Sequence, residues 1–151
     1  MQTNNDRTSQ AAPLWTRAIV LINARVFVDF GLAFLAKPQA LARLLEIELS
    51  SPTALADLRA MYGGLALAVG ALLCAGLRRK EWLMPSLWLV IATSGGLALG
   101  RLYSVLASGL PSGVILGFLA SELGSLAWAI LASRALAGSE IRQPALGAVS
   151  S

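Results

Sequence analysis

The chain has 151 residues, of which 56% are hydrophobic and 13% are charged, with a formal net charge of +4 and a mean hydropathy of +0.69. Soluble globular domains contain about 45–50% apolar and about 25% charged residues, so this composition excludes an ordinary water-soluble protein. The basic residues are scattered or lie at the ends of hydrophobic runs, which excludes a nucleic-acid-binding patch.

The sequence contains one cysteine, Cys74, and no histidine. This content excludes an intrachain disulfide, CxxC redox chemistry, histidine-ligated haem and the usual zinc sites. We therefore predict no metal site and no cofactor, and we assign no catalytic residue.

Four apolar runs follow one another along the chain, each close to the roughly 20 residues that a membrane-spanning helix needs. We predict spans at about residues 14–36, 58–77, 82–106 and 113–136. Residues 1–13 and 137–151 are polar and unpatterned, which predicts two disordered tails. The sequence therefore predicts an all-α membrane protein with a four-transmembrane-helix bundle as its single domain.

A shorter segment between the first two spans has a different pattern. Residues 38–49 place leucines near one helical face and charged residues elsewhere, which predicts a short amphipathic helix. It is too short to cross a bilayer and is suited to the membrane surface. The polar residues 50–53 end it.

The distribution of Lys and Arg predicts the orientation, because short loops rich in these residues stay cytoplasmic. Seven of them fall on one side of the predicted membrane: Arg7, Arg17, Arg78, Arg79, Lys80, Arg134 and Arg142. Lys37, Arg43 and Arg59 fall on the other side. We therefore expect both termini in the cytoplasm, with the spans in the cytoplasmic membrane of a bacterium.

Small residues at four-residue spacing predict how the spans pack, because membrane helices associate by close approach at such positions. Spans three and four carry the longest series and should lie closely antiparallel, and span two has a shorter one. The predicted helix-packing residues are Gly64, Gly96, Gly100, Gly113, Gly117 and Ser121.

Five charged residues lie in or at the edge of the spans: Arg25, Asp29, Arg59, Arg101 and Glu122. A charge near the bilayer centre costs at least about 2.5–3.5 kcal/mol and usually faces the bundle interior with a partner. At about 1.5 Å per residue, Asp29 and Arg101 lie roughly 8–10 Å and Arg25 and Glu122 roughly 14–16 Å from the outer ends of their spans. All five are expected in the outer half.

The charges suggest two contacts and a net charge of about +1 if all five are ionised. Arg25 and Asp29 are four residues apart on one helical face, and Arg101 can reach Glu122 between spans three and four. The predicted polar cluster comprises Arg25, Asp29, Arg59, Tyr62, Arg101, Ser104 and Glu122.

Two interpretations of this cluster stay open. In the first, the charges are interhelical ion pairs that fix helix register, and Arg59 extends to the interface. In the second, they form a pocket open toward the outer leaflet that recognises an anionic or strongly polar group, with Glu122 as proton acceptor or counter-charge.

The same residues carry a family resemblance. Arg59-Ala60-Met61-Tyr62-Gly63-Gly64, Gly100-Arg101 with Ser104, Gly109-x-Pro111-Ser112 and Glu122-Leu123 resemble the DUF4345 family of bacterial membrane proteins over about residues 18–136. The chain departs from that pattern at Ser108, where an acidic residue is expected. The resemblance implies a four-helix membrane protein without an assigned activity, distantly similar to DoxX-type proteins.

Three functions are compatible with these features. The first is a non-enzymatic protein that binds, or helps move, a small amphiphile or lipid headgroup at the polar cluster. The second is an accessory or structural subunit of a membrane complex, with the charges as interhelical ion pairs. The third is a membrane enzyme acting on lipid or quinone, with Glu122 or Tyr62 in acid–base chemistry. Expected partners are membrane lipid, a small amphiphilic or anionic ligand, a second copy or a larger membrane complex, and no nucleic acid.

Overall fold

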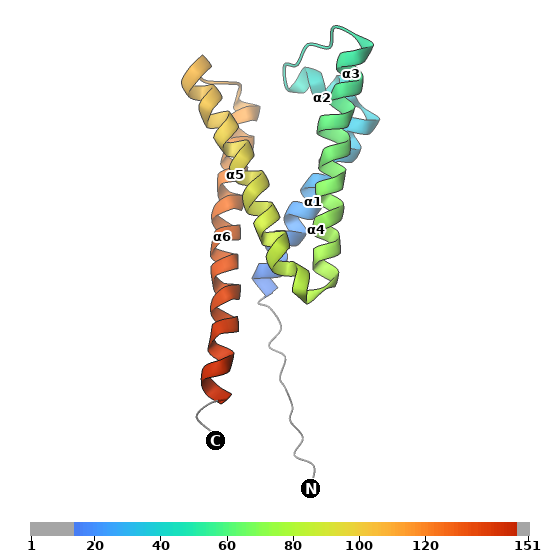
Figure 1. The fold of residues 1–151 in the computed structure, drawn as a ribbon. Coiled ribbons are helices and arrows are strands. Elements are labelled where there is room, and N and C mark those ends of the chain that lie inside the picture. Colours follow the sequence, from blue (N-terminus) through green and yellow to red (C-terminus); the bar gives the residue numbers. More distant parts are fainter. Residues whose placement is uncertain (1–13, 148–151) are drawn as a thin grey trace.

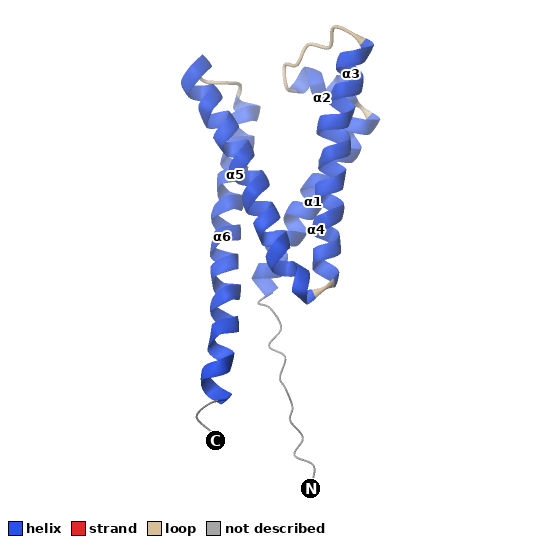
Figure 2. Cartoon of the chain, viewed as in Figure 1, coloured by secondary structure: helices blue, strands red, loops and turns tan. Residues whose placement is uncertain are grey.

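The computed structural model describes the fold of residues 14–147 and the side chains of residues 14–138. Every regular element within these residues is helical (Figure 2). In chain order they are α1 (Leu14–Ala36), α2 (Pro38–Leu44), α3 (Pro52–Leu58), the π-helix η1 (Arg59–Gly64), α4 (Leu65–Arg78), the 3-10 turn η2 (Lys80–Trp82), α5 (Leu83–Ser108) and α6 (Gly113–Gly147). The predicted tails fall partly outside the described residues.

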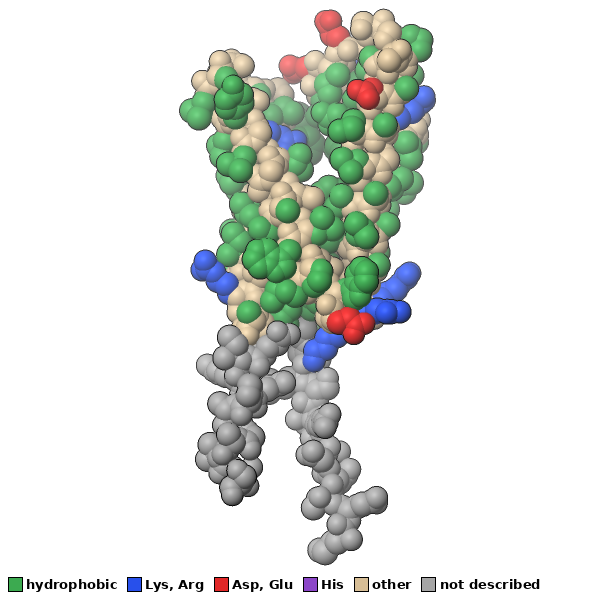
Figure 3. All heavy atoms as spheres, in the orientation of Figure 1, with side chains coloured by type: hydrophobic (Ala, Val, Ile, Leu, Met, Phe, Trp, Pro, Cys, Tyr) green, Lys and Arg blue, Asp and Glu red, His purple; other side chains and the backbone are tan. Residues whose placement is uncertain are grey.

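Four helices are long and apolar enough to cross a membrane. They cover Leu14–Ala36, Pro52–Arg78, Lys80–Ser108 and Gly113–Gly138, and the short helix α2 lies between the first two. The predicted fold class, an all-α membrane protein with four transmembrane helices and a short helix after the first, is confirmed. Figure 3 shows hydrophobic side chains over the middle of the visible face and charged ones gathered at its two ends.

The second span begins earlier than predicted because residues 51–52 start a helix. The Ser51 hydroxyl oxygen accepts a hydrogen bond from the Ala54 N–H at 3.2 Å, and Pro52 occupies the first helical turn. α3, η1 and α4 then follow without a break from Pro52 to Arg78. The span therefore extends six residues before the predicted start at residue 58.

The short helix α2 ends five residues before the predicted end at residue 49. The Ile47 N–H donates to the Ala42 carbonyl and the Glu46 N–H donates to the Arg43 carbonyl, which together form a Schellman motif. Glu46 takes the left-handed position that glycine usually occupies, with φ of 59°.

The last helix is longer than predicted. α6 continues to Gly147 rather than ending near residue 136, so the backbone of residues 137–147 is helical. Several residues in this stretch, among them Ala137, Glu140, Arg142 and Gln143, favour helices. The structure thus describes residues 137–147 as helix where the sequence predicted a tail without regular structure.

The four spans form two pairs that diverge like the arms of a V (Figure 1). α1 packs mainly against α4, and α5 packs mainly against α6. The pairs meet at the end of the bundle that contains Arg79, called here the Arg79 end, and separate toward the Gly109 end, where α2 and the α5–α6 turn lie. The largest buried core belongs to the Arg79 end and includes Ile19, Leu73, Leu87 and Ala129.

Glycines bring the backbone of α1 close to the backbones of η1 and α4, an approach that the predicted glycines do not make between α5 and α6. A Cβ atom built on Gly31 would lie 2.8 Å from the Gly63 carbonyl oxygen and 2.9 Å from the Leu67 amide nitrogen. One built on Gly70 would lie 2.7 Å from Val28 Cγ2. These glycines therefore allow the two backbones to approach.

The predicted packing glycines occupy a different environment. Among the described residues, a Cβ atom on four of them would meet nothing within 4 Å: Gly96, Gly100, Gly113 and Gly117. Gly64 meets only the Arg59 carbonyl, at 3.9 Å, and the side chain of Ser121 is exposed and lines the cleft between the pairs. α5 and α6 do lie side by side, but the assignment of these residues to a tight contact was wrong.

Candidate functional site

A cavity of about 720 Å³ fills the cleft between the two helix pairs. Pockets for small ligands usually measure about 300–1,000 Å³. Residues 19–30 of α1 line its length, roughly 16 Å at 1.5 Å per residue. The lining is mostly apolar, and all four spans contribute to it, including Leu97 from α5 and Trp128 from α6.

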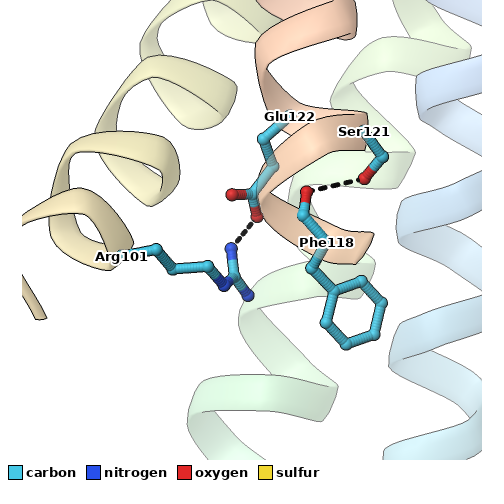
Figure 4. A network of polar contacts seen from close by, with 4 residues as sticks. All are labelled: Arg101, Phe118, Ser121 and Glu122. Atoms are coloured by element: carbon cyan, nitrogen blue, oxygen red, sulfur yellow. Dashed lines mark hydrogen bonds and ion pairs between the residues drawn. The ribbon is translucent and has the colours of Figure 1, made fainter. Parts of the chain in front are cut away.

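The main polar feature of the cavity is an ion pair between α5 and α6. Nη1 of Arg101 donates to Oε1 of Glu122, as Figure 4 shows, and the two side chains are 25% and 12% exposed. The guanidinium also lies over the Phe118 ring, with its Cζ 5.5 Å from the ring centroid. Since such a site has a low dielectric constant, each charge depends on the other for its stability.

The second carboxylate oxygen, Oε2 of Glu122, is buried and has no hydrogen-bond partner among the described residues. Buried polar atoms are normally paired, and each exception needs an explanation. An unpaired carboxylate oxygen is a strong acceptor, so the site is able to bind a group that donates an O–H or N–H.

A group of aromatic rings that includes Phe118 connects the two helix pairs. The Phe30 and Phe118 ring centroids are 6.4 Å apart and edge-to-face, joining α1 to α6. The Tyr62 centroid lies 5.1 Å from that of Phe34 and 6.4 Å from that of Phe30. Edge-to-face contacts of this kind stabilise the arrangement of the rings.

Tyr62 reaches the cavity from the π-helix η1. In this segment the Leu65 N–H donates to the Ala60 carbonyl five residues earlier, which widens the helix. Gly63 follows Tyr62, and a Cβ atom on it would lie 2.7 Å from Leu35 Cδ2, so a larger residue would require the Leu35 side chain to move. π-helical turns are frequent at functional sites in proteins.

A second polar contact crosses the cleft on the side of the Arg79 end, where the helix pairs meet. The Ser125 hydroxyl donates to Oδ1 of Asn23 at 2.9 Å, and Nδ2 of Asn23 donates to the Ile19 carbonyl at 2.9 Å. Both side chains line the cavity. Sequence reasoning missed this contact, although an asparagine within a membrane span was a usable signal, because such side chains hydrogen-bond between helices.

The structure brings together three of the seven residues of the predicted cluster: Tyr62, Arg101 and Glu122. The lining does not include Arg59 or Ser104, both of which are exposed, and the Ser104 hydroxyl donates to the Gly100 carbonyl at 3.0 Å.

Arg25 and Asp29 also lie outside the cavity. Nε of Arg25 donates to Oδ2 of Asp29 at 2.6 Å, as the four-residue spacing predicted, but the two side chains are 77% and 55% exposed. With Arg59 outside as well, Arg101 and Glu122 carry the only charges that the described residues contribute to the lining. The cavity therefore carries no surplus positive charge, and the predicted sum of +1 does not apply to it.

The sequence of the chain matches one family model over residues 15–133, that of the domain of unknown function DUF4345. The chain belongs to the DUF4345 family. The resemblance found in the motifs around Tyr62, Arg101 and Glu122 is thereby confirmed. No curated protein and no solved structure matches this DUF4345 protein.

Proposed function

We propose that this DUF4345 protein binds, or helps to move, a small uncharged amphiphile or a lipid with an uncharged headgroup. The apolar part of this ligand occupies the cleft between the helix pairs, and the polar head of the ligand contacts Arg101 and Glu122. The observation that carries the proposal is the unpaired, buried Oε2 of Glu122 in a mostly apolar cavity of about 720 Å³.

The charge of the cavity supports an uncharged head. Arg101 and Glu122 neutralise each other, so an anionic ligand would add an uncompensated charge to an apolar surrounding, at a large energetic cost. A hydroxyl or amide head avoids that cost. It donates one hydrogen bond to Oε2 of Glu122 and accepts another from the Arg101 guanidinium, which has five N–H donors.

Trp128 provides a direct test because it lines the cavity. In a variant whose other tryptophans are replaced by phenylalanine, a brominated long-chain alcohol should quench Trp128 fluorescence in a saturable manner. The matching brominated alkyl sulfate should quench it much less. The control retains Trp88 alone, since Trp88 is 61% exposed and does not line the cavity.

The substitution Gly124→Leu is designed to block the cavity in the same fluorescence experiment. Gly124 lines the cavity, and its Cβ position meets no described atom within 4 Å, so the larger side chain fills the cleft without disturbing the backbone. It should abolish saturable quenching while leaving the thermal unfolding temperature unchanged. Equal quenching of Trp128 and Trp88, unaffected by Gly124→Leu, would contradict the proposal.

We further propose that the protein lies in the cytoplasmic membrane of a bacterium with the Arg79 end inside the cell. Arg17, Arg78, Arg79, Lys80 and Arg134 lie at or near this end, whereas the Gly109 end carries three basic residues, Lys37, Arg43 and Arg59. Basic loops of short length remain cytoplasmic, which supports this orientation.

Cysteine labelling in intact cells tests the orientation. In a Cys74→Ser background, a membrane-impermeant maleimide should label Ser108→Cys at once and Glu81→Cys only after the cells are permeabilised. Both positions are exposed, so a difference in labelling reports sidedness rather than burial. The reverse pattern would contradict the proposed orientation.

A further inference from the structure

Arg25 and Asp29 form an ion pair on the outer surface of the bundle, in the middle of a membrane span. Arg25 is the twelfth of the 23 residues of α1, and Asp29 lies one turn nearer the Gly109 end. Their side chains are 77% and 55% exposed, and the Nε–Oδ2 distance is 2.6 Å. The pair therefore faces away from both the core and the cavity.

This position is unusual for charged residues. Ionisable side chains within membrane spans almost always face the bundle interior or a water-filled cavity. Here the neighbours one turn away on the same face are Leu21 and Leu32, 57% and 53% exposed, so the surroundings are apolar surface. A single copy of the protein leaves both charges against lipid.

We propose that this face of α1, formed by Leu21, Arg25, Asp29 and Leu32, binds the same face of a second copy. Both copies have the same orientation in the membrane, so the two-fold axis runs along the membrane normal and the α1 helices lie parallel. Asp29 is about 6 Å further along the helix than Arg25, at 1.5 Å per residue. The long Arg25 side chain bridges that offset and pairs with Asp29 of the other copy.

The charge pattern favours a second copy over a different protein. An isologous dimer uses the same surface of both copies, so the surface must be self-complementary. If one residue of the first copy contacts a second residue of the other copy, the reverse contact forms as well. A face with one charge of each sign, at adjacent turns, satisfies this condition through two reciprocal Arg25–Asp29 contacts. Arginine also has enough N–H donors to keep its contact within the chain while it contacts the other copy.

Crosslinking of otherwise intact protein tests the proposal. In a Cys74→Ser background, Leu32→Cys should form a disulfide-linked dimer in native membranes on mild oxidation. Leu99→Cys is the control, because Leu99 is 69% exposed but lies on α5. A dimer from Leu32→Cys alone supports the proposal. Equal crosslinking of both variants, or no crosslinking of either, would overturn it.

Charge exchange tests the ion pairs themselves. Arg25→Asp and Asp29→Arg should each lose dimerisation alone, because each face then carries two like charges. Co-expressed with different affinity tags, the two variants should recover each other, because opposite charges now meet at both contacts. Failure of the co-expressed pair to associate, when Leu32→Cys also fails to crosslink, would refute the dimer.

Discussion

Replacing Gly31 by alanine is expected to destabilise the protein by about 1–3 kcal/mol, the usual range for forcing extra volume into a packed interior. The added methyl group would lie 2.8 Å from the Gly63 carbonyl oxygen and 2.9 Å from the Leu67 amide nitrogen. Because both are backbone atoms, no side-chain rotation relieves the clash. α1 and α4 must separate, which loosens one wall of the cavity. Reversible unfolding in mixed micelles measures the change.

Gly96→Ala is the matched control, since it makes the same chemical change in the middle of another span. Among the described residues nothing lies within 4 Å of the new methyl group. The variant should therefore be neutral or more stable by up to about 1 kcal/mol, because alanine favours the helix over glycine. Equal destabilisation by the two substitutions would indicate a close contact at Gly96 as well, contrary to the structure.

Replacing Arg101 by alanine is expected to cost about 3–5 kcal/mol, because it leaves the Glu122 carboxylate buried without a counter-charge. The Glu122 side chain is only 12% exposed, so solvent cannot replace the lost partner. The double variant Arg101→Met/Glu122→Gln should recover most of the stability, since no unpaired charge remains. The free energies of unfolding of these two variants and of the unchanged protein measure this coupling.

Two comparisons make this result informative. Arg79→Ala removes a pair with Glu81 at 3.8 Å, whose side chains are 71% and 72% exposed, and exposed pairs contribute only about 0–1 kcal/mol. The double variant should fold yet lose saturable quenching of Trp128, which separates ligand binding from stability. A double variant that still binds the alcohol would leave the ion pair with a structural role alone.

The sequence predicted the number of spans and the Arg101 to Glu122 contact for separate physical reasons. Apolar runs of sufficient length specify membrane spans directly. A single opposite charge on each of two adjacent helices leaves few alternatives for pairing. The family motif around Tyr62 also indicated the segment of span two that reaches the cavity. It gave no sign that this segment is a π-helix.

The sequence could not predict which side of α1 lies toward the interior of the bundle. In a soluble helix the apolar face marks the interior, but in a membrane both faces are apolar and this pattern disappears. Arg25 and Asp29 were therefore expected inside, whereas the structure places them outside. The four-residue spacing of small residues also did not identify the glycines that make close helix contacts. Gly96 and Gly117 have this spacing, but Gly31 and Gly70 lie where the helix backbones approach.

The divergence of the two helix pairs has a consequence for how binding must be measured. Because the cleft lies between membrane spans and its walls are mostly apolar, bilayer acyl chains compete for the same space as any ligand. The relevant concentration is then the mole fraction of ligand in the bilayer, not its concentration in water. Two amphiphiles with the same polar head but different water solubility should therefore give similar occupancy once their partitioning into the membrane is taken into account.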